Sequence, residues 1–180
     1  MYKKQKKNFN LIKNIINYIN SDIKLKYIFN HPNRKYNLKL LLKYVIQILN
    51  TGLSYRNVTN YSSSKIHWNT IYKFSIKLQK YNVITLSYYD TVNKYIKKNM
   101  INKTNILLTD TTLISNKLGI DNIGYNPQNP KHKVSKISLI TDVNGIPLMA
   151  NIYNGSLYDS KILDNQLDDF INKFPKLLNN

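Results

Sequence analysis

Cysteine and glutamate are absent from the sequence, and arginine and alanine are rare. Without cysteine, the 180 residues can form neither a disulfide framework nor a thiolate metal site, so we expect a reducing compartment. Without glutamate, all nine acidic residues are aspartates. Arginine occurs only at Arg34 and Arg56, and alanine only at Ala150.

Long apolar runs are also missing. The longest, such as Ile106–Leu108 and Leu40–Leu42, are far too short to cross a bilayer. Residues 1–7 are basic, but Phe9–Ile19 is interrupted by Asn and Lys and offers no small-residue cleavage site, so we expect no signal peptide. These absences predict a soluble intracellular protein without a membrane partner, cytoplasmic (at the nucleoid) if it is bacterial.

Positive charge is what the sequence has in excess. Its 27 Lys and Arg residues give a formal net charge of +18 and a pI near 9.9. Such a charge attracts polyanions, and the attraction weakens with salt. AT-rich codons encode Lys, Asn, Ile and Tyr, so biased nucleotide composition accounts for part of the lysine excess. It does not account for the scarcity of acids, and the charge therefore favours a nucleic-acid partner.

The first part of the chain predicts a helical domain over residues 9–103, preceded by a solvated basic tail over residues 1–8. Apolar periodicity predicts one helix from Phe9 to Ile19. Gly52 is placed to end a second helix in a left-handed cap, and the Ser54 hydroxyl to cap a short helix after it. Five residues predict the apolar face of the second helix: Leu38, Leu41, Leu42, Val45 and Leu49.

A further helical stretch begins near Trp68. Its apolar side is predicted to hold Trp68, Ile71, Phe74 or Ser75, and Leu78. Lys73, Lys77 and Lys80 share the other side at spacings of four and three. This arrangement suits a helix lying against a phosphate backbone, but it equally describes an ordinary surface helix whose lysines face water.

The pattern changes to strands after residue 105. Ile106–Leu108 predicts a strand buried on both faces that delivers Thr109–Thr112 at its end. A long irregular loop is expected over residues 113–133. Two strands, Ser135–Thr141 and Ile146–Tyr153, follow around an Asn144-Gly145 hairpin turn. A final helix is expected to be capped by Ser156 or Asp159, with Ile162, Leu163, Leu167 and Phe170 on its apolar face.

Asp110 is the candidate catalytic residue. A carboxylate at the end of a buried strand is costly to desolvate unless it is paired or binds a metal ion. Spacing alone nevertheless favours a simpler role, in which Asp110 caps the next segment, because Asp before Thr-Thr is good turn chemistry. By the same reasoning, Asp142 is expected to be a hairpin residue and Asp159 a helix N-cap. The three histidines have no ligand spacing that predicts zinc.

Several segments, in order, resemble the IS4/IS5-type DDE transposases. Leu108–Lys117 resembles the family's first-aspartate strand, and Lys133–Leu148 its basic loop and K-x-x-x-x-D-x-N-G-x-P-L hairpin. Asn154–Ser160 resembles its A-N-x-H-D-S helix entry. In the DNA-binding region, Leu49–Val58 resembles L-x-T-G-x-x-W-R-x-L, and Trp68–Phe74 resembles W-x-T-V-Y-R-R-F.

The resemblance implies an α+β protein: a helical, helix-turn-helix-like domain and then an incomplete RNase H-like α/β domain over residues 104–180. Asp110 would be the first acid of an Asp, Asp, Glu site that binds Mg²⁺. The second acid would lie on a strand after the final helix, beside the first strand, and the third would be a glutamate; neither is expected in this chain. The expected DNA-binding residues are Arg56, Lys73, Lys77, Lys80, Lys131, Lys133 and Lys136.

The implied function is binding to transposon-end DNA, as a homo-oligomer, with metal-dependent cleavage and joining once the missing acids are supplied. A second chain carrying those acids is one expected partner. Other interpretations stay open: a truncated, catalytically inactive DNA-binding protein or regulator, or a decayed fragment that neither folds nor binds.

Overall fold

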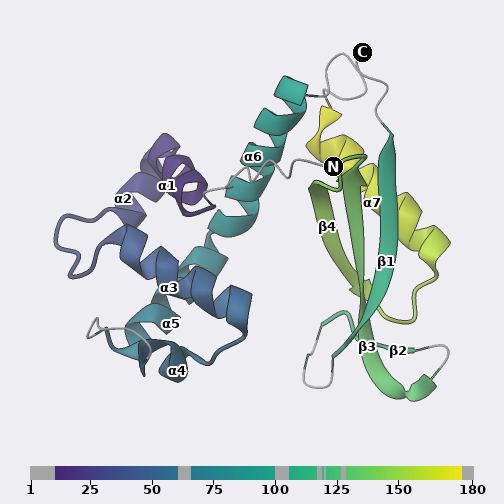
Figure 1. The fold of residues 1–180 in the computed structure, drawn as a ribbon, viewed down its shortest axis with the longest axis horizontal. Coiled ribbons are helices and arrows are strands. Elements are labelled where there is room, and N and C mark those ends of the chain that lie inside the picture. The colour runs from purple at the N-terminus through teal and green to yellow at the C-terminus, as the bar shows by residue number, and fades with distance from the viewer. Residues whose placement is uncertain are drawn as a thin grey trace, which may run out of the picture. The chain divides into compact units, whose positions relative to one another are not determined.

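The computed structural model describes residues 11–60, 66–99, 106–116, 119, 121–126 and 129–175, excluding the side chains of residues 60, 99, 126 and 129–131. The described residues form a mixed α+β fold of seven helices and one open antiparallel sheet of four strands, which confirms the predicted α+β class. The chain divides into two compact units, Met1–Thr91 and Val92–Asn180. The division falls within helix α6 (Val83–Asn99), whereas the sequence-based boundary was at residue 103 (Figure 1). No helix in the described ranges is long and apolar enough to cross a membrane.

The described part of the first unit consists of helices and the turns that join them. It holds α1 (Leu11–Ser21), α2 (Ile23–Phe29), α3 (Leu38–Thr51), α4 (Tyr55–Asn60), α5 (Trp68–Lys80) and the beginning of α6. Apolar residues at helical spacing put one side of each of the longer helices into a shared core. Among the most deeply buried side chains of that core are Ile15, Ile19, Phe29, Leu42, Ile71 and Leu78.

Local sequence determines where these helices begin and end. The Asp22 carboxylate caps α2 by accepting a hydrogen bond from the Leu25 N–H at 2.8 Å. Gly52 ends α3 with a left-handed φ of 68°, and the Ser54 hydroxyl accepts from the Asn57 N–H at 3.2 Å in α4. Both sequence predictions for these two residues are confirmed. The inward placement predicted for Leu49 is wrong, because this side chain is 62% exposed at the end of α3.

The second unit contains the sheet. Strand β3 (Asn129–Asp142) pairs along one edge with β1 (Leu107–Ser115). Its other edge pairs with β2 (Gly124–Asn126) and then with β4 (Pro147–Asn154). Gly145 has a φ of 72° in the turn between β3 and β4, so the predicted Asn144-Gly145 hairpin is confirmed.

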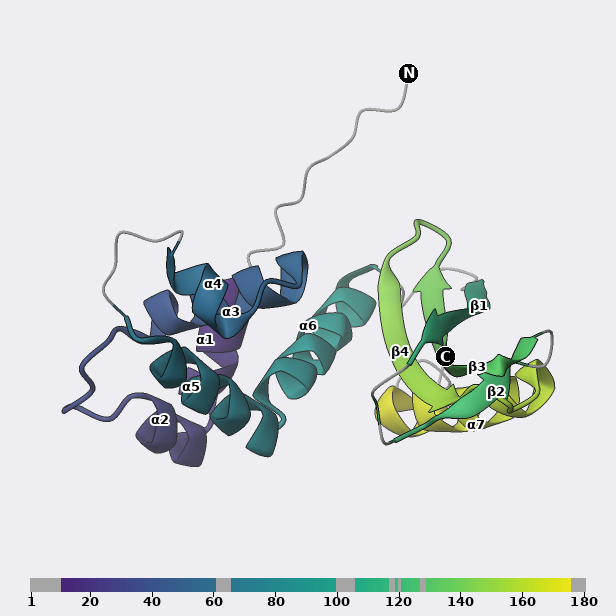
Figure 2. The ribbon, with the colours of Figure 1, turned by 90° about the horizontal axis from the view of Figure 1, so that it is seen from below.

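Helix α7 (Asp159–Lys173) lies across one face of this sheet (Figure 2). Hydrogen bonds fix which face it covers: the Thr109 and Ser138 hydroxyls both donate to Gln166 Oε1. Apolar packing accompanies them, since Ile140 is 1% exposed and Ile162 is fully buried. Successive side chains of a strand point to opposite faces, so the neighbours of Thr109 on β1 point away from α7.

The structure corrects three predictions for the second unit. Ile106 and Leu108 are 62% and 51% exposed, so the first strand is not buried on both faces. The strand also continues to Ser115, because its β-branched residues pair with β3. The expected loop over residues 113–133 is correspondingly shorter, since it contains the end of β1, all of β2 and the start of β3.

Candidate nucleic-acid interface and carboxylate strand

The charge of the chain is concentrated in the first unit. Sixteen of the 27 Lys and Arg residues lie between Met1 and Thr91, against two of the nine acids, Asp22 and Asp90. The formal net charge of this unit is therefore +14 of the total +18. A helical unit with so few acids cannot neutralise its cations internally, and their field extends into solvent.

Helices α4 and α5 bring together the two segments that resemble the family's DNA-binding region. The guanidinium of the exposed Arg56 lies over the Trp68 ring, 5.0 Å from its centroid. The Tyr55 hydroxyl is 2.7 Å from Ser75 Oγ, and the Tyr55 and Tyr72 rings meet edge to face. The α4–α5 contact thus holds the Arg56 guanidinium over an aromatic ring. This cation–π contact fixes an exposed positive charge in a position where it could contact a phosphate.

The three lysines of α5 do not have equivalent surroundings. Lys73 and Lys80 are exposed, but Lys77 is partly buried and its ammonium donates to the Ile28 carbonyl at 3.0 Å. At 3.6 residues per turn, these lysines lie on the side of α5 away from Trp68. The predicted DNA-binding residues of the first unit therefore form two patches, Arg56 with Trp68 and the α5 lysines.

Arg34, in the segment between α2 and α3, is a cation that belongs to none of the predicted DNA-binding segments. Its guanidinium lies 5.7 Å from the centroid of the Phe74 ring on α5. Burial lowers the pKa of Arg34. Burial also lowers the pKa of Lys77, and the nearby charge of Arg34 lowers it further. The fold thus brings Arg34 and Lys77 together, and no local sequence pattern predicts this.

Asp110 lies in the middle of β1 rather than at its end, and pairs with Leu139 of β3. Its side chain is exposed, and Oδ1 accepts a hydrogen bond from the Thr111 N–H at 2.8 Å. Thr109 and Thr111 both donate to residues of α7, so Asp110 points to the other face of the sheet. The desolvation argument for metal binding by Asp110 therefore does not hold.

Magnesium is the cofactor that the resemblance implies, and the described residues can be tested for it. They contain no group of three or more acidic, His or Cys side chains that could hold a metal ion. Asp110 is one carboxylate, already accepting a backbone hydrogen bond, whereas two-metal phosphoryl transfer needs several carboxylates around the ions. The described residues alone therefore do not fit a magnesium site, and Mg²⁺ stays a prediction.

The basic residues expected near Asp110 are dispersed. Lys136 points to the α7 side, where its ammonium donates to the Leu157 carbonyl at 2.7 Å and to Asp159 Oδ1 at 2.8 Å. Lys133 is exposed on β3, six residues from the partner of Asp110, a separation of about 20 Å along a strand. The Lys131 side chain is outside the described part of the structure.

Asp159 is engaged in pairing rather than capping. It is the first residue of α7, whose N-cap position is Tyr158, and no side-chain hydrogen bond caps the helix there. Its carboxylate instead accepts from Lys136 and, at 3.1 Å, from the Thr111 hydroxyl. These two hydrogen bonds lower the pKa of Asp159. The predicted N-cap role of Asp159 is wrong, because its carboxylate accepts hydrogen bonds from Lys136 of β3 and Thr111 of β1 instead.

Asp142 has the hairpin role predicted for it and one partner that was not predicted. Oδ1 accepts from the Asn144 and Ile146 N–H groups at 2.9 and 2.8 Å. Oδ2 accepts from the Tyr95 hydroxyl of α6. Burial raises the pKa of Asp142, but the hydrogen bonds from Tyr95, Ile146 and Asn144 outweigh it and leave the pKa below its ordinary value.

Comparison with known proteins adds no relative: no family model matches the chain, and neither a curated protein nor a solved structure does. The transposase resemblance thus depends on the quoted sequence segments alone.

Proposed function

We propose that this chain binds DNA through the phosphate backbone, as the DNA-binding part of a transposase-like protein. The observation that carries the proposal is the concentration of positive charge in the first unit, which has sixteen basic residues and only two acidic ones. Lys73 and Lys80 are exposed on α5, and Arg56 is exposed on α4. Positively charged side chains of this kind supply the sequence-independent part of DNA affinity.

A salt titration with matched variants tests the proposal. In filter-binding measurements on duplex DNA, log K should fall linearly with log salt. A Lys73→Gln/Lys80→Gln double variant should reduce the slope by about 1.8, because each phosphate contact contributes about 0.9. The matched control is Lys24→Gln/Lys43→Gln, which removes the same charge from exposed positions of α2 and α3. Equal losses in the two double variants would mean that DNA has no local binding site on α5.

A second candidate function is phosphoryl transfer at Asp110, with further acids supplied from elsewhere. Two features support it. Asp110 is exposed on β1, and within the described residues β1 pairs only with β3, so its other edge is open to another strand. The meander of β1, β3 and β4 followed by α7 also agrees with the order of elements expected for the first part of an RNase H-like domain.

Cleavage assays separate the two candidates. The chain by itself should bind element-end DNA without cutting it in the presence of Mg²⁺, because one carboxylate does not make the site. Addition of a second chain that carries the missing acids should start cleavage, and Asp110→Asn should abolish it while DNA binding persists. Cleavage that is unaffected by Asp110→Asn would remove Asp110 from the proposed site.

A further inference from the structure

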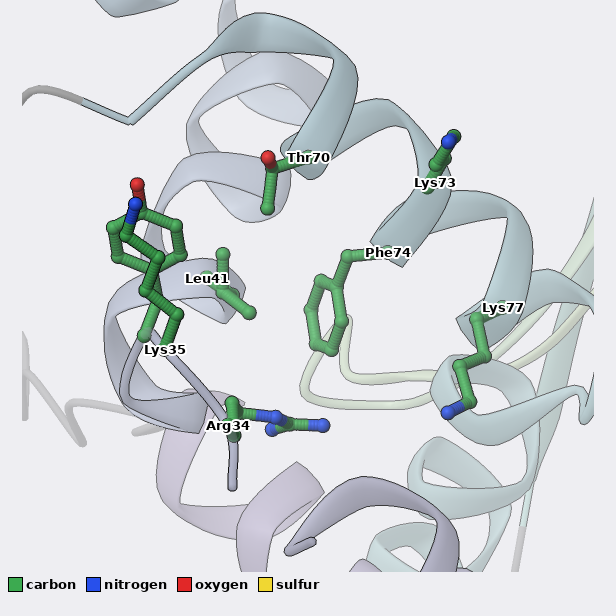
Figure 3. A pocket seen from close by; sticks show the side chains of 8 residues that line it. Arg34, Lys35, Leu41, Thr70, Lys73, Phe74 and Lys77 are labelled. Atoms are coloured by element: carbon green, nitrogen blue, oxygen red, sulfur yellow. The ribbon is translucent and has the colours of Figure 1, made fainter. Parts of the chain in front are cut away.

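An open hollow of about 360 Å³ lies beside the segment between α2 and α3. Half of its eight lining residues are cations: Arg34, Lys35, Lys73 and Lys77. Phe74 forms part of its wall (Figure 3). All of these residues belong to the first unit.

Arg34 and Lys77 are the two cations that face each other in this hollow. Their side chains point toward one another below the Phe74 ring, whereas Lys73 turns away from them (Figure 3). The Nη1 atom of Arg34 is buried and has no hydrogen-bond partner among the described residues. Lys77 donates to Ile28 and lies 5.4 Å from the centroid of the Phe29 ring. Of its three donor hydrogens, one is used by that bond.

Within the described ranges, no carboxylate shifts the pKa of Arg34 or of Lys77. The unit has two acids, and one of them, Asp22, uses its carboxylate to cap α2. Among the described residues, neither Arg34 nor Lys77 forms an ion pair with a carboxylate. A buried guanidinium N–H without an acceptor is costly, and two neighbouring cations repel each other. An anion in the hollow would offset this repulsion and offer acceptors to the guanidinium.

We infer that the hollow binds one phosphate group, with Arg34 as the forked donor and Lys77 as the second positive charge. Arginine matches the geometry of phosphate oxygens with two parallel hydrogen bonds, and lysine binds phosphate as a point charge. The identity of the phosphate rests on the proposed function: a backbone phosphodiester of DNA. Free phosphate has the same kind of negatively charged oxygens and would bind the same two cations.

The presence of only two arginines makes the test direct. In the ¹⁵N-labelled full chain, the side-chain Nε–H signals belong to Arg34 and Arg56, and an Arg56→Lys variant assigns them. Inorganic phosphate is titrated against chloride at constant ionic strength. The Arg34 signal should shift and saturate, while the Arg56 signal, from an exposed side chain on Trp68, should barely move. Equal shifts of both signals, or no saturable shift of Arg34, would overturn the inference.

Variants of Lys77 test whether the NMR shift of Arg34 comes from the hollow. They leave Arg34 in place, because its substitution would disturb the packing on Phe74. Lys77→Gln keeps a donor for Ile28 but removes the charge, and should weaken phosphate binding at least about tenfold, which corresponds to about 1.4 kcal/mol. Lys43→Gln removes the same charge from exposed α3 and should change the affinity less than twofold. Equal weakening by both would contradict a localised site.

A short DNA duplex used in place of phosphate identifies the source. A saturable Arg34 shift with both ligands supports a backbone phosphate in the hollow. A shift with phosphate alone supports the anion site and counts against its use for DNA. DNA binding that moves only the Arg56 signal, with phosphate having no effect on Arg34, overturns the inference and leaves the proposed function intact.

Discussion

The hydrogen bond between Tyr95 and Asp142 leads to a quantitative prediction for the second unit. Tyr95→Phe removes the hydroxyl that donates to Oδ2 of Asp142, a residue that is only 3% exposed. A hydrogen bond to a charged group contributes about 1.5–3 kcal/mol. Asn144 Nδ2 also donates to Oδ2, at 3.1 Å, so this oxygen keeps one partner in the variant. We therefore expect a loss at the lower end, about 1.5–2 kcal/mol at neutral pH.

Urea denaturation followed by far-ultraviolet circular dichroism measures this loss. With a slope of about 1.5 kcal/mol per molar urea, the midpoint for the second unit should fall by about 1 M. The matched control is Tyr153→Phe, because the Tyr153 hydroxyl accepts from a neutral amide, Asn151 Nδ2, at 3.1 Å. That variant should lose about 0.5–1 kcal/mol.

The pH dependence separates a charged hydrogen bond from simple packing. The pKa of Asp142 is lowered in the folded state, so its stabilisation is present above the ordinary carboxyl pKa of about 4 and is lost as the pH falls through the folded value. The pKa of Tyr95 is raised, by burial and then by Asp142, so the hydrogen bond persists below about pH 10 and is lost as the pH rises further. The effect of Tyr95→Phe should shrink toward that of Tyr153→Phe in acid. An effect that is the same near pH 3 and pH 7 would refute the reasoning.

Three further changes have predictable results. Gly155→Ala should destabilise the second unit by more than about 2 kcal/mol in chemical denaturation, because the new Cβ would lie 2.4 Å from the Val134 carbonyl oxygen; a loss under about 0.5 kcal/mol would contradict this contact. Gly52→Ala meets no neighbouring atom, so only the left-handed φ of 68° opposes it, and thermal unfolding should show a loss of about 1 kcal/mol. Lys136→Met should return the pKa of Asp159 toward its ordinary value in an NMR titration, with a stability loss of only about 1 kcal/mol because the Asp159 side chain is 66% exposed; an unchanged pKa would contradict the pairing.

Features that depend on neighbouring residues were predictable from the sequence. The Gly52 cap, the Ser54 cap and the Asn144-Gly145 turn each depend on backbone geometry within a few residues. The buried side of α5 was likewise predicted, since Ile71, Phe74 and Leu78 recur at helical spacing.

Features that depend on distant partners were not predictable in this way. An apolar run such as Ile106–Leu108 does not reveal whether one face of the strand or both will be covered, and here Ile106 and Leu108 stay exposed. The sequence also places Lys136 and Asp159 far apart, so their ion pair emerges only from the pairing of strands with α7. Arg34 became a candidate site residue for the same reason, because the fold brings it to Lys77.

The stacking of Arg56 on Trp68 has an optical consequence. Trp68 is the single tryptophan of the chain; the Arg56 guanidinium lies over its ring, and the centroid of the His67 ring lies 5.4 Å from that of the Trp68 ring. Indole emission responds to charge and water at the ring. A DNA phosphate that draws Arg56 off Trp68 should therefore change the fluorescence of the unlabelled protein, so the chain carries its own reporter for DNA at the patch of Arg56 and Trp68.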